Sequence, residues 1–478
     1  MSGDTASVRE VDLVVIGSGS GNSIADERFA DRSVAIIERN PVFGGTCLNV
    51  GCIPTKMFVQ AANVARSATD AARFGVDAQF TGARWSDIVG RIFGRIDSIS
   101  RSGEQWRRSG AANVSLISGT ARFTAPLTLE IGDGPDAGTI VRAGQIVLAT
   151  GSRAIVPDVI ADSGVAFHTS DTIMRLPQLP RHLVIVGSGT IAAEFANIFS
   201  GLGSRVTIIA RGDHLLRTMD RDISDTFTRL ASKQWDVRLG CEVAGLTGPA
   251  LDGPGEGADN AIAVALSDGS TVTCDTVLVA VGRHPNGDHL GAEHGGVQLA
   301  PSGEVVVDRC GRTTARNVWA LGDVASEDQL KHVANAQARA VADNLLRNWD
   351  DTADLAAFPD VPIPRAVFTQ PEIATVGLTE GQARDAGYDI AVKVQPLGAV
   401  AYGWALEDSD GFCKVIAERG TGRLLGAHIL GLAASTVIQP LIQAMSFGQT
   451  ATEVARGQYW IHPALSELVE NALLGLDI

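Results

Sequence analysis

Residues 11–22 of this chain read VDLVVIGSGSGN, an apolar run that ends in a glycine-rich turn. A continuous apolar run of this kind is typical of a parallel strand buried on both faces. Glycines let a backbone approach a pyrophosphate closely, and a following helix presents its N-terminal amides to the phosphate oxygens. The stretch therefore predicts a strand, a phosphate-binding turn at Gly17, Gly19 and Gly21, a helix and a second strand. Asn22 stands where a third glycine is usual, so an ordinary tight turn is the alternative.

The same pattern returns at 182–211, where HLVIVG and RVTIIAR surround a second glycine turn. This turn carries Gly187 and Gly189, with Ala192 in the third position, which the pattern allows. Gly203 stands where a helix C-cap is expected before the returning strand. Two copies of one strand-turn-helix-strand pattern predict an α/β chain with two dinucleotide-binding units.

The two copies differ where their second strands end. In the first copy Glu38 ends the strand, about 20 positions after the turn, where a carboxylate can accept hydrogen bonds from a ribose hydroxyl. In the second copy the strand ends in Arg211, and Arg217 follows shortly after. Two guanidinium groups would bind a 2′-phosphate, which a carboxylate would repel. The second unit is therefore predicted to bind NADPH rather than NADH, unless the two arginines are merely solvated surface residues.

Length and composition exclude several classes of protein. A chain of 478 residues is too long for one core of ordinary size, and 45% hydrophobic residues allow it to bury several. The net charge of −15 opposes binding to nucleic acid or to an anionic membrane, since both require a basic face. No apolar stretch reaches the roughly 18 residues of a membrane helix, and we expect no secretory leader. The sequence thus predicts a soluble, cytoplasmic protein, whose six cysteines do not form a disulfide scaffold.

The most specific segment is 44–56, which reads GGTCLNVGCIPTK. In a regular helix the Cα atoms of Cys47 and Cys52 would lie about 8.6 Å apart, whereas a disulfide tolerates at most about 7 Å. A disulfide here requires a distorted backbone, and a strained, accessible disulfide is easily reduced. Lys56 lies one helical turn beyond Cys52, where its charge favours a thiolate. A redox-active pair is predicted. Half a zinc site or two buried thiols are the alternatives, but no second ligand pair follows at metal spacing, so no metal site is expected.

This cysteine segment resembles the active-site signature of the pyridine nucleotide-disulphide oxidoreductases, a family of flavoproteins. The likeness extends along nearly the whole chain, since ATG at 149–151 resembles the family's strand-end motif and TARNVWALGD at 314–323 resembles its second FAD motif. The resemblance implies two Rossmann-like dinucleotide-binding domains, for FAD and NADPH, and a C-terminal α+β dimerisation domain. The expected boundaries are 1–153 for the FAD domain, 154–281 for the NADPH domain, 282–349 for a return segment of the central domain and 350–478 for the dimerisation domain.

The resemblance also implies roles for individual residues. Cys52 would face the flavin and Cys47 would attack the substrate disulfide, while Glu194 would pair with Lys56 beside the flavin. The expected FAD contacts are Gly17, Gly19, Gly21, Glu38, Gly45, Thr46, Thr150, Gly151, Gly322 and Asp323. The expected NADPH contacts are Gly187, Gly189, Ala192, Arg211, Arg217 and Gly282.

A histidine near the end of the chain is a candidate acid/base. Residues 462–467 read HPALSE, and thiol-disulfide exchange needs a proton donor that titrates near neutral pH. Glu467 would fix the tautomer of His462 and raise its basicity. Taken alone, His-Pro could also mark the start of a helix. In the family this histidine acts on the disulfide of the partner subunit, so the resemblance implies an obligate homodimer with His462 acting in trans.

The substrate is predicted from resemblance alone. The stretches GSGSGNSIADERFA, CIPTKMF, FGRID and RGQYWIHPALSE resemble the branch of the family that reduces the disulfide of mycothiol. Reduction of glutathione disulfide or coenzyme A disulfide is an alternative. A third possibility is a lipoamide dehydrogenase-type component of a larger complex. In each case the partner expected is a disulfide substrate, with no nucleic acid and no membrane.

Overall fold

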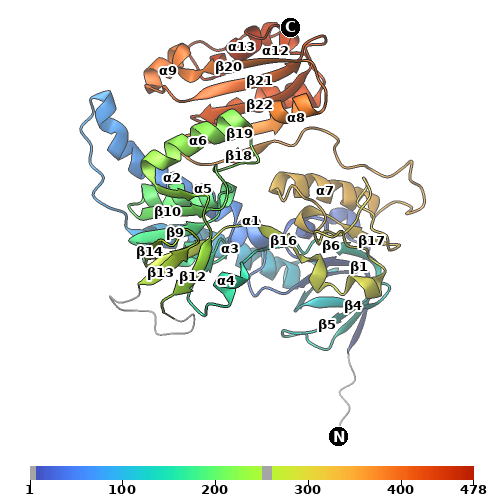
Figure 1. The fold of residues 1–478 in the computed structure, drawn as a ribbon. Helices are drawn as coiled ribbons and strands as arrows, with labels where there is room; N and C mark the ends of the chain where they lie inside the picture. The colour runs from blue at the N-terminus through green and yellow to red at the C-terminus, as the bar shows by residue number, and fades with distance from the viewer. Residues whose placement is uncertain (1–6, 250–260) are drawn as a thin grey trace. The chain divides into compact units, whose positions relative to one another are not determined.

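The computed structural model describes residues 7–249 and 261–478, and the chain separates into two compact units (Figure 1). The first unit comprises Met1–Thr55, Ser86–Ile155 and Gly282–Pro359, and the second comprises Lys56–Trp85, Val156–Val281 and Asp360–Ile478. The four-part division expected from the sequence stays a prediction. Residues 1–6, on which the expectation of no secretory leader partly rests, lie outside the described residues. None of the described helices is both long and apolar enough to cross a membrane.

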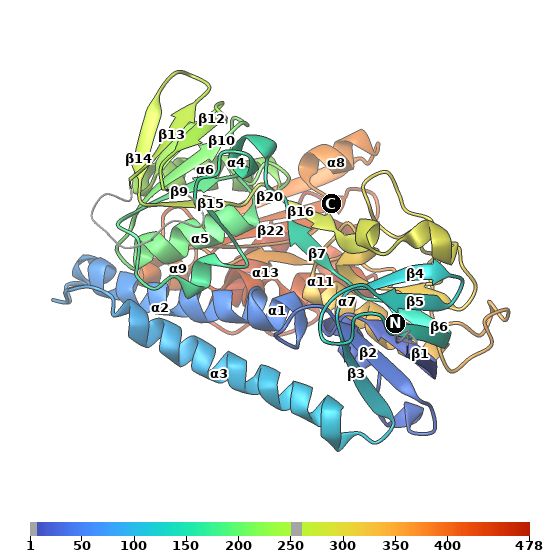
Figure 2. The same ribbon diagram turned by 90° about the horizontal axis from the view of Figure 1, so that it is seen from below.

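The first unit is built on a seven-stranded sheet in the order β3-β2-β1-β6-β5-β4, with β17 paired to β6. Its strands are β1 (Val8–Ile16), β2 (Val34–Glu38), β3 (Val114–Ser118), β4 (Ala121–Ala125), β5 (Thr128–Ile131), β6 (Ile140–Leu148) and β17 (Val318–Ala320). Strands β1, β2, β3, β6 and β17 are parallel, while β4 and β5 add an antiparallel edge beside β6 (Figure 2). Alternate residues of β1 enter two different cores, Val14 on one face and Val15 on the other. This confirms the expected strand buried on both faces.

Further helices and short strands belong to this unit. They are α1 (Gly45–Asn49), the first turn of α2 (Cys52–Asp70), α3 (Trp85–Gln105), the π-helical turn η4 (Trp106–Gly110), α7 (Lys331–Asn344), β7 (Ser152–Ala154) and β16 (Arg283–Pro285). Strands β7 and β16 pair with each other. Helix α2 begins in the first unit and continues into the second, because the units divide after Thr55.

The first nucleotide-binding unit lacks the helix expected after its glycine turn. Two short 3-10 helices stand there instead, η1 (Ser20–Ser23) and η2 (Glu27–Phe29). Asp26 between them is extended, and its carboxylate accepts a hydrogen bond from the backbone N–H of Arg28 at 2.9 Å. This is an N-cap bond, so a separate helical turn begins after Asp26 instead of one continuous helix. The prediction of a helix in this copy is wrong.

The second unit carries the second nucleotide-binding fold, a five-stranded sheet in the order β11-β10-β9-β15-β8. The elements of this part are β8 (His168–Thr169), β9 (His182–Val186), β10 (Arg205–Ala210), β11 (Asp236–Leu239), β15 (Thr276–Val279), α4 (Asp158–Ala161), α5 (Thr190–Gly201), α6 (Arg221–Gln234) and the antiparallel β12 (Val243–Thr247), β13 (Ile262–Leu266) and β14 (Thr271–Cys274). Here the expected helix is present as α5. It ends as predicted at Gly203, which has a φ of +110° and is followed by Ser204, whose N–H bonds back to Phe199 O at 2.9 Å.

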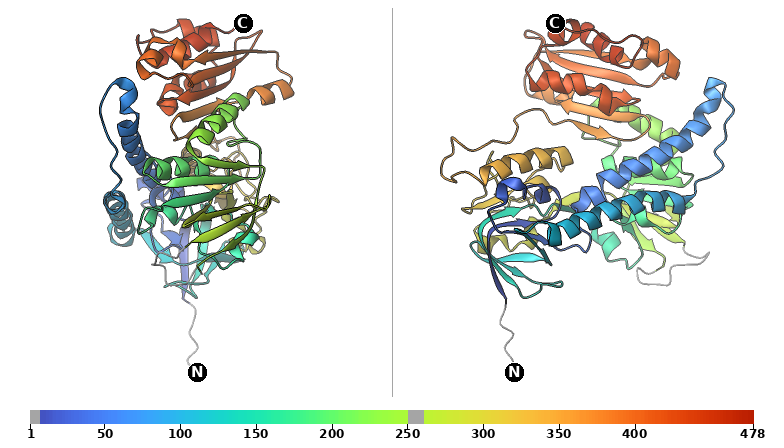
Figure 3. Two further views of the ribbon diagram at one scale, coloured as in Figure 1. Left: turned by 60° about the vertical axis from the view of Figure 1, so that its left-hand side comes forward. Right: turned by 180° about the vertical axis from the view of Figure 1, so that it is seen from behind.

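The C-terminal part of the second unit is an antiparallel sheet covered by helices (Figure 3). Its strand order is β18-β19-β22-β21-β20. The elements are β18 (Arg365–Val367), β19 (Glu372–Gly377), β20 (Ile390–Pro396), β21 (Phe412–Glu418), β22 (Leu424–Gly431), α8 (Glu380–Asp385), α9 (Ala401–Leu406), α10 (Ala434–Val437), α11 (Gln439–Ser446), α12 (Ala451–Arg456) and α13 (Ser466–Leu474). One apolar core joins the sheet to the last four helices. The expected α+β character of this part is confirmed.

Candidate active site

The cysteine segment is distorted between its two thiols, as a disulfide there requires. Helix α1, which carries Cys47, ends at Val50 with φ −142° and ψ 10°, and Cys52 opens the next helix, α2. Gly51 permits this break, because a Cβ there would lie 2.9 Å from the carbonyl oxygen of Thr46. The predicted break in the helix is therefore confirmed. It also places Cys52 at a helix N-terminus, where the helix dipole favours a thiolate.

The side chains of the two cysteines are joined by a hydrogen bond. The hydrogen bond from Cys52, aided by the charge of Lys331, lowers the pKa of the Cys47 thiol to about 7, although burial opposes the shift. A pKa near 7 leaves a substantial fraction of Cys47 as thiolate at neutral pH, and the thiolate is the nucleophile in disulfide exchange. Lys56 was expected from its spacing to favour a thiolate at Cys52, whereas nothing in the sequence pointed to Lys331, which lies far from Cys47 along the chain.

Lys56 instead makes an ion pair with Glu194 of α5, which is the pairing that the resemblance implied. The Lys56 Nζ atom also lies 4.3 Å from the ring centre of Phe368, whose backbone N–H donates to Glu194 Oε1 at 3.0 Å. Glu194 is only 9% exposed, so the two contacts satisfy a carboxylate that would be costly to bury alone. The geometry fixes the ammonium group one helical turn beyond Cys52.

His462 and Glu467 form a close pair near the end of the chain. The Nδ1 atom of His462 lies 2.5 Å from Glu467 Oε1, and Glu467 Oε2 accepts the backbone N–H of Ala464 at 3.3 Å. The Glu467 side chain is 14% exposed, whereas that of His462 is 68% exposed. A carboxylate that binds Nδ1 orients the ring and leaves Nε2 to exchange a proton. This arrangement suits a general acid/base that is presented outward.

Glu38 at the end of β2 binds the first glycine turn directly. Its Oε2 atom accepts hydrogen bonds from the backbone N–H and the hydroxyl of Ser18, at 2.9 and 2.6 Å. The same Ser18 hydroxyl accepts the N–H of Gly44, at the start of the cysteine segment, at 2.7 Å. Ser18 is buried and was not singled out from the sequence. It ties the predicted ribose-binding carboxylate to both the turn and the redox segment.

Two further features of the first unit fit a bound dinucleotide. Among the residues that the structure describes, the buried hydroxyl of Thr150 has no partner, and a Cβ on the neighbouring Gly151 would meet no atom within 4 Å. Asp323 follows Gly322 in a turn after β17, and its carboxylate accepts the hydroxyl of Ser152 at 2.7 Å. An orphaned hydroxyl beside open space is what a missing ligand leaves behind. These residues are therefore suited to hold the FAD expected from the sequence.

Gly45 and Thr46 lie at the start of α1, against the first glycine turn. Gly45 has a φ of +72°, and a Cβ there would lie 2.5 Å from the Cα atom of Gly19. Gly17 is similarly restricted, since a Cβ there would lie 2.3 Å from the carbonyl oxygen of Ala149. Gly21 is buried within η1. Glycine is required at these positions by backbone packing as well as by any approach of a phosphate.

Asn22, which stands in place of the usual third glycine, is held by hydrogen bonds from an arginine. Arg107 of η4 donates to Asn22 from Nε to Oδ1 at 2.8 Å and from Nη2 to the backbone carbonyl at 3.1 Å. The guanidinium carbon lies 4.0 Å from the ring centre of Trp106. Lys331 also reaches this turn, where its Nζ donates to Ser20 Oγ at 2.8 Å. Two cations therefore flank a turn that has no full helix behind it.

The second glycine turn has the expected form. Gly187 has a φ of +137°, and a Cβ there would lie 2.2 Å from Ala280 O, whereas a Cβ on Gly189 would meet nothing within 4 Å. Gly189 is the N-cap of α5, so open space lies at the N-terminus of a helix of 12 residues, in which Ala192 is buried. Such a helix end binds phosphate well.

Arg211 and Arg217 are both exposed and lie beyond β10. A Cβ on Gly212 would lie 3.8 Å from Arg217 Cδ, so the Arg217 side chain folds back toward Arg211. The role of the two arginines as NADPH contacts stays a prediction. Gly282, the last predicted NADPH contact, belongs to the first unit, where its carbonyl accepts the N–H of Ile155 at 3.0 Å. Its role stays a prediction.

Comparison with known families now decides the class of protein. The profile of the pyridine nucleotide-disulphide oxidoreductases matches residues 11–340, and the dimerisation domain of the same family matches residues 363–473. The chain belongs to this family. As a pyridine nucleotide-disulphide oxidoreductase it is an enzyme with FAD and NADPH as cofactors, and its C-terminal domain supports a homodimer.

Individual relatives agree with this assignment. The oxidoreductase is 54% identical to mycothione reductase of Mycobacterium tuberculosis over 97% of this chain and 99% of that protein. It is 33% identical to dihydrolipoyl dehydrogenase of Corynebacterium glutamicum over 98% of each chain. Among solved structures, it resembles the HOCl-induced flavoprotein disulfide reductase RclA of Escherichia coli, determined as a Cu(II) complex, with a TM-score of 0.83, 28% identity and coverage of 98% and 99% of the two chains.

The remaining cysteines of the oxidoreductase are packing residues. All four are buried, and burial raises the pKa of Cys274 and of Cys413 to about 12. Thiols with such pKa values are unreactive at neutral pH. The four are Cys241, Cys274, Cys310 and Cys413. Within 7–249 and 261–478, no group of three or more potential ligands is placed to hold a metal ion.

Proposed function

We propose that this oxidoreductase reduces mycothione, the disulfide of mycothiol, with electrons from NADPH. The observation that carries the proposal is the 54% identity to mycothione reductase over 97% of the chain. The paired thiols Cys47 and Cys52 and the pair of His462 with Glu467 support the chemistry. We place this reaction in the cytoplasm, where thiols are kept reduced.

FAD, when bound, accepts a hydride from NADPH and passes two electrons to the Cys47–Cys52 disulfide. The residues of the chain then carry out the exchange with substrate. The thiolate of Cys47 attacks one sulfur of mycothione, forms a mixed disulfide and releases the first mycothiol as a thiolate. His462 of the partner subunit donates the proton that this leaving thiolate needs, while Glu467 stabilises the protonated ring. Cys52 then attacks Cys47, which restores the internal disulfide and releases the second mycothiol.

Two pairs of residues would tune these steps without reacting. Glu194 fixes the ammonium group of Lys56 near the N-terminus of α2, where its charge favours a thiolate on Cys52. Arg211 and Arg217 would bind the 2′-phosphate of NADPH, in place of the carboxylate found in the first unit. One NADPH and one proton are consumed, and two thiols are produced.

A substrate panel tests the proposal. With NADPH as donor, the purified homodimer is expected to reduce mycothione with a kcat/KM at least about a hundredfold above that for the disulfides of glutathione and coenzyme A. Equal or better reduction of either alternative would reject mycothione as substrate. Activity only as part of a larger complex with a lipoyl substrate would assign the chain to the lipoamide dehydrogenase type.

Replacement of the attacking thiol separates the two halves of the reaction. Cys47→Ser is expected to abolish disulfide reduction, a loss of more than about a thousandfold, while NADPH still bleaches the flavin absorbance in a stopped-flow experiment. Cys413→Ser, at a buried thiol with no part in the exchange, is the matched control and should retain turnover. Retained turnover in Cys47→Ser would reject its role as nucleophile.

A further inference from the structure

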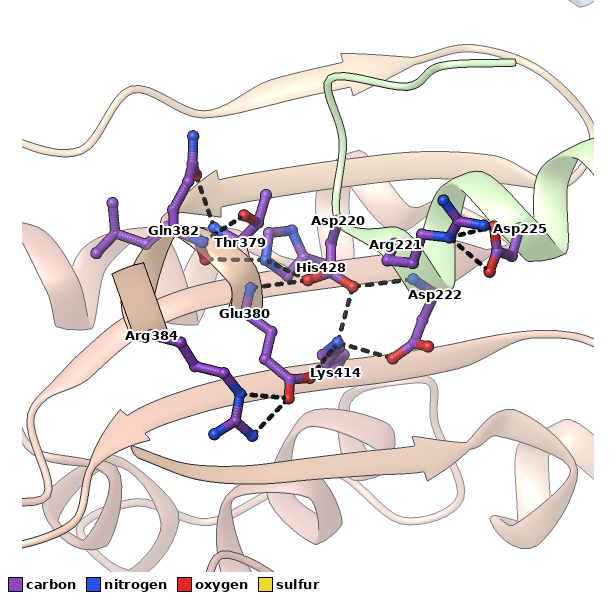
Figure 4. A network of polar contacts seen from close by, with 11 residues as sticks. Asp220, Arg221, Asp222, Asp225, Thr379, Glu380, Gln382, Arg384, Lys414 and His428 are labelled. Atoms are coloured by element: carbon purple, nitrogen blue, oxygen red, sulfur yellow. Dashed lines mark hydrogen bonds and ion pairs between the residues drawn. The ribbon is translucent and has the colours of Figure 1, made fainter. Parts of the chain in front are cut away.

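A buried lysine in the C-terminal sheet lies among three carboxylates (Figure 4). Lys414 of β21 is 2% exposed, and its Nζ lies 2.8 Å from Asp220 Oδ1, 2.7 Å from Asp222 Oδ2 and 2.8 Å from Glu380 Oε2. An ammonium group has three N–H donors, so each donor has one carboxylate. We call these four residues the Lys414 cluster.

The Lys414 cluster joins three elements of the second unit. Asp220 is the N-cap of α6 and accepts the N–H of Asp222 at 3.1 Å. Its other oxygen, Oδ2, accepts the N–H of Glu380 in α8 at 2.9 Å and lies 4.0 Å from Nε2 of the buried His428 in β22. Burial opposes the charge on Lys414, but the hydrogen bonds that it donates to the three carboxylates raise its pKa above the ordinary value. The lysine therefore remains an ammonium ion inside the fold.

Asp220 depends on this lysine because it is itself buried. Its side chain is 1% exposed, whereas those of Glu380 and Asp222 are 30% and 50% exposed. An unpaired carboxylate at such a site would have to take up a proton or move to water. Glu380 and Asp222 can turn to solvent without moving the backbone, but Asp220 cannot. Loss of Lys414 would therefore either protonate Asp220 or move it, and both changes alter the hydrogen bonds by which Asp220 holds the backbone at Asp222 and Glu380.

The backbone at Asp220 leads directly to the predicted phosphate-binding arginines. The segment 211–220 starts at Arg211, contains Arg217 and ends at Asp220. In its middle, Leu216 has a φ of +54°, and its N–H donates to the carbonyl of Ser188 at 2.8 Å. Ser188 lies between the two glycines of the second turn. The segment is thus held at the glycine turn and at Asp220, with Arg217 between the two points.

We propose that Lys414 is a positioning residue for NADPH: through Asp220 it holds the segment 211–220 so that Arg211 and Arg217 meet the 2′-phosphate. The inference rests on the proposed selection of NADPH by these arginines. It assigns to the dimerisation domain a part in cofactor choice, although no residue of that domain is expected to touch the nucleotide. Lys414 acts only through the segment, so its effect should fall on the 2′-phosphate and not on the rest of the cofactor.

The test compares Lys414→Met with a control variant that removes a different ion pair between α6 and the C-terminal domain. Arg229 of α6 lies 2.7 Å from Asp410, just before β21, and both side chains are largely exposed. Arg229→Ala therefore removes another link between α6 and the C-terminal domain, away from the segment 211–220. Lys414→Met should raise the KM for NADPH on the order of tenfold and change the KM for NADH less than about twofold. Arg229→Ala should leave the ratio of the KM for NADPH to the KM for NADH unchanged.

Binding provides a readout that does not depend on turnover. Calorimetric titration of the holoenzyme with adenosine 2′,5′-bisphosphate, and with AMP as the probe that lacks the 2′-phosphate, should show weaker binding of the bisphosphate alone in Lys414→Met. If the affinities for both probes fall equally, or the KM values for NADPH and NADH rise equally, Lys414 has only a structural role. Either result overturns the proposal. If Lys414→Met does not fold, Asp220→Asn keeps the shape of the side chain, weakens its pairing with Lys414 and should lower selectivity about threefold. Unchanged selectivity in that variant also overturns the proposal.

A third variant separates this inference from the proposed function. Exchange of both Arg211 and Arg217 for Ala should remove the preference for NADPH, and Lys414→Met should then have no further effect on selectivity. If the double arginine variant keeps its preference, the proposed cofactor selection fails, whatever Lys414 does. If it loses the preference while Lys414→Met keeps it, only the positioning role fails.

Discussion

The two glycine turns of this chain begin alike in sequence but are built differently. The second turn is followed by a full α-helix, α5, and its own unit supplies Arg211 and Arg217. The first turn is followed by two short 3-10 helices, and the strand after them ends at Glu38. Positive charge reaches it from Arg107 and Lys331, in other parts of the chain. A helix N-terminus and imported cations are thus two means of binding phosphate within one protein.

The largest effect should come from reversing the charge at the second turn. Arg211→Glu combined with Arg217→Ala is expected to lower the ratio of kcat/KM for NADPH to that for NADH by about a hundredfold, since two charge-assisted contacts are lost and a repulsion is added. Steady-state kinetics with both cofactors measures this ratio. The flavin content of the purified variant serves as a control and should not change, because the first turn is untouched. An unaltered ratio would show that the arginines are only solvated.

A smaller effect is expected at the first turn. Arg107→Met should weaken retention of FAD by about tenfold, because Asn22 loses both hydrogen bonds that fix it and the turn loses one of its two cations. Release of flavin fluorescence on dilution and on heating measures retention. Arg108→Met is the matched control, since Arg108 is adjacent and makes an exposed pair with Glu104 at 2.9 Å. Equal flavin loss in the two variants would contradict a specific role for Arg107.

The smallest effect concerns Lys331, which serves both the first turn and the redox pair. The thiolate of Cys47 should form as pH rises through about 7 and be lost as pH falls below it. Lys331→Met removes a cation that favours the thiolate, so the midpoint should move upward by about half a pH unit, while the larger contribution of Cys52 remains. Alkylation of Cys47 in the reduced enzyme, followed peptide by peptide across pH, measures the midpoint. Lys233→Met is the control, and a midpoint that stays near 7 in Lys331→Met would exclude this role.

Local pattern predicted much of this molecule. Apolar runs ending in glycine located β1 and β9, and the spacing of Cys47 and Cys52 required the break that the structure has between α1 and α2. Each of these features is decided by residues close together in the chain. The same reasoning predicted one helix after the first turn and failed, since two short 3-10 helices stand there and Asp26 caps the second.

Contacts between distant parts of the chain could not be predicted in this way. Asn22 was a departure from pattern with no visible cause, and its partner Arg107 lies 85 positions away. Lys331, Lys414 and His428 carry no motif, since a single lysine or histidine in a strand or helix is compatible with any surface. Their importance arises only when folding brings them beside a thiol or a buried carboxylate. The family resemblance supplied the pairing of Lys56 with Glu194, which spacing alone would not have given.

The contact between Gly45 and Gly19 packs the cysteine segment directly against the first glycine turn. A single methyl group on Gly45 would stand 2.5 Å from the Cα atom of Gly19, so the cofactor turn and the redox segment touch backbone to backbone. A designer who wished to graft this dithiol onto another nucleotide-binding scaffold would have to transfer both glycines together. For the same reason, substitutions in the two stretches should show strong epistasis, and a library that varies only one of them would recover few active clones.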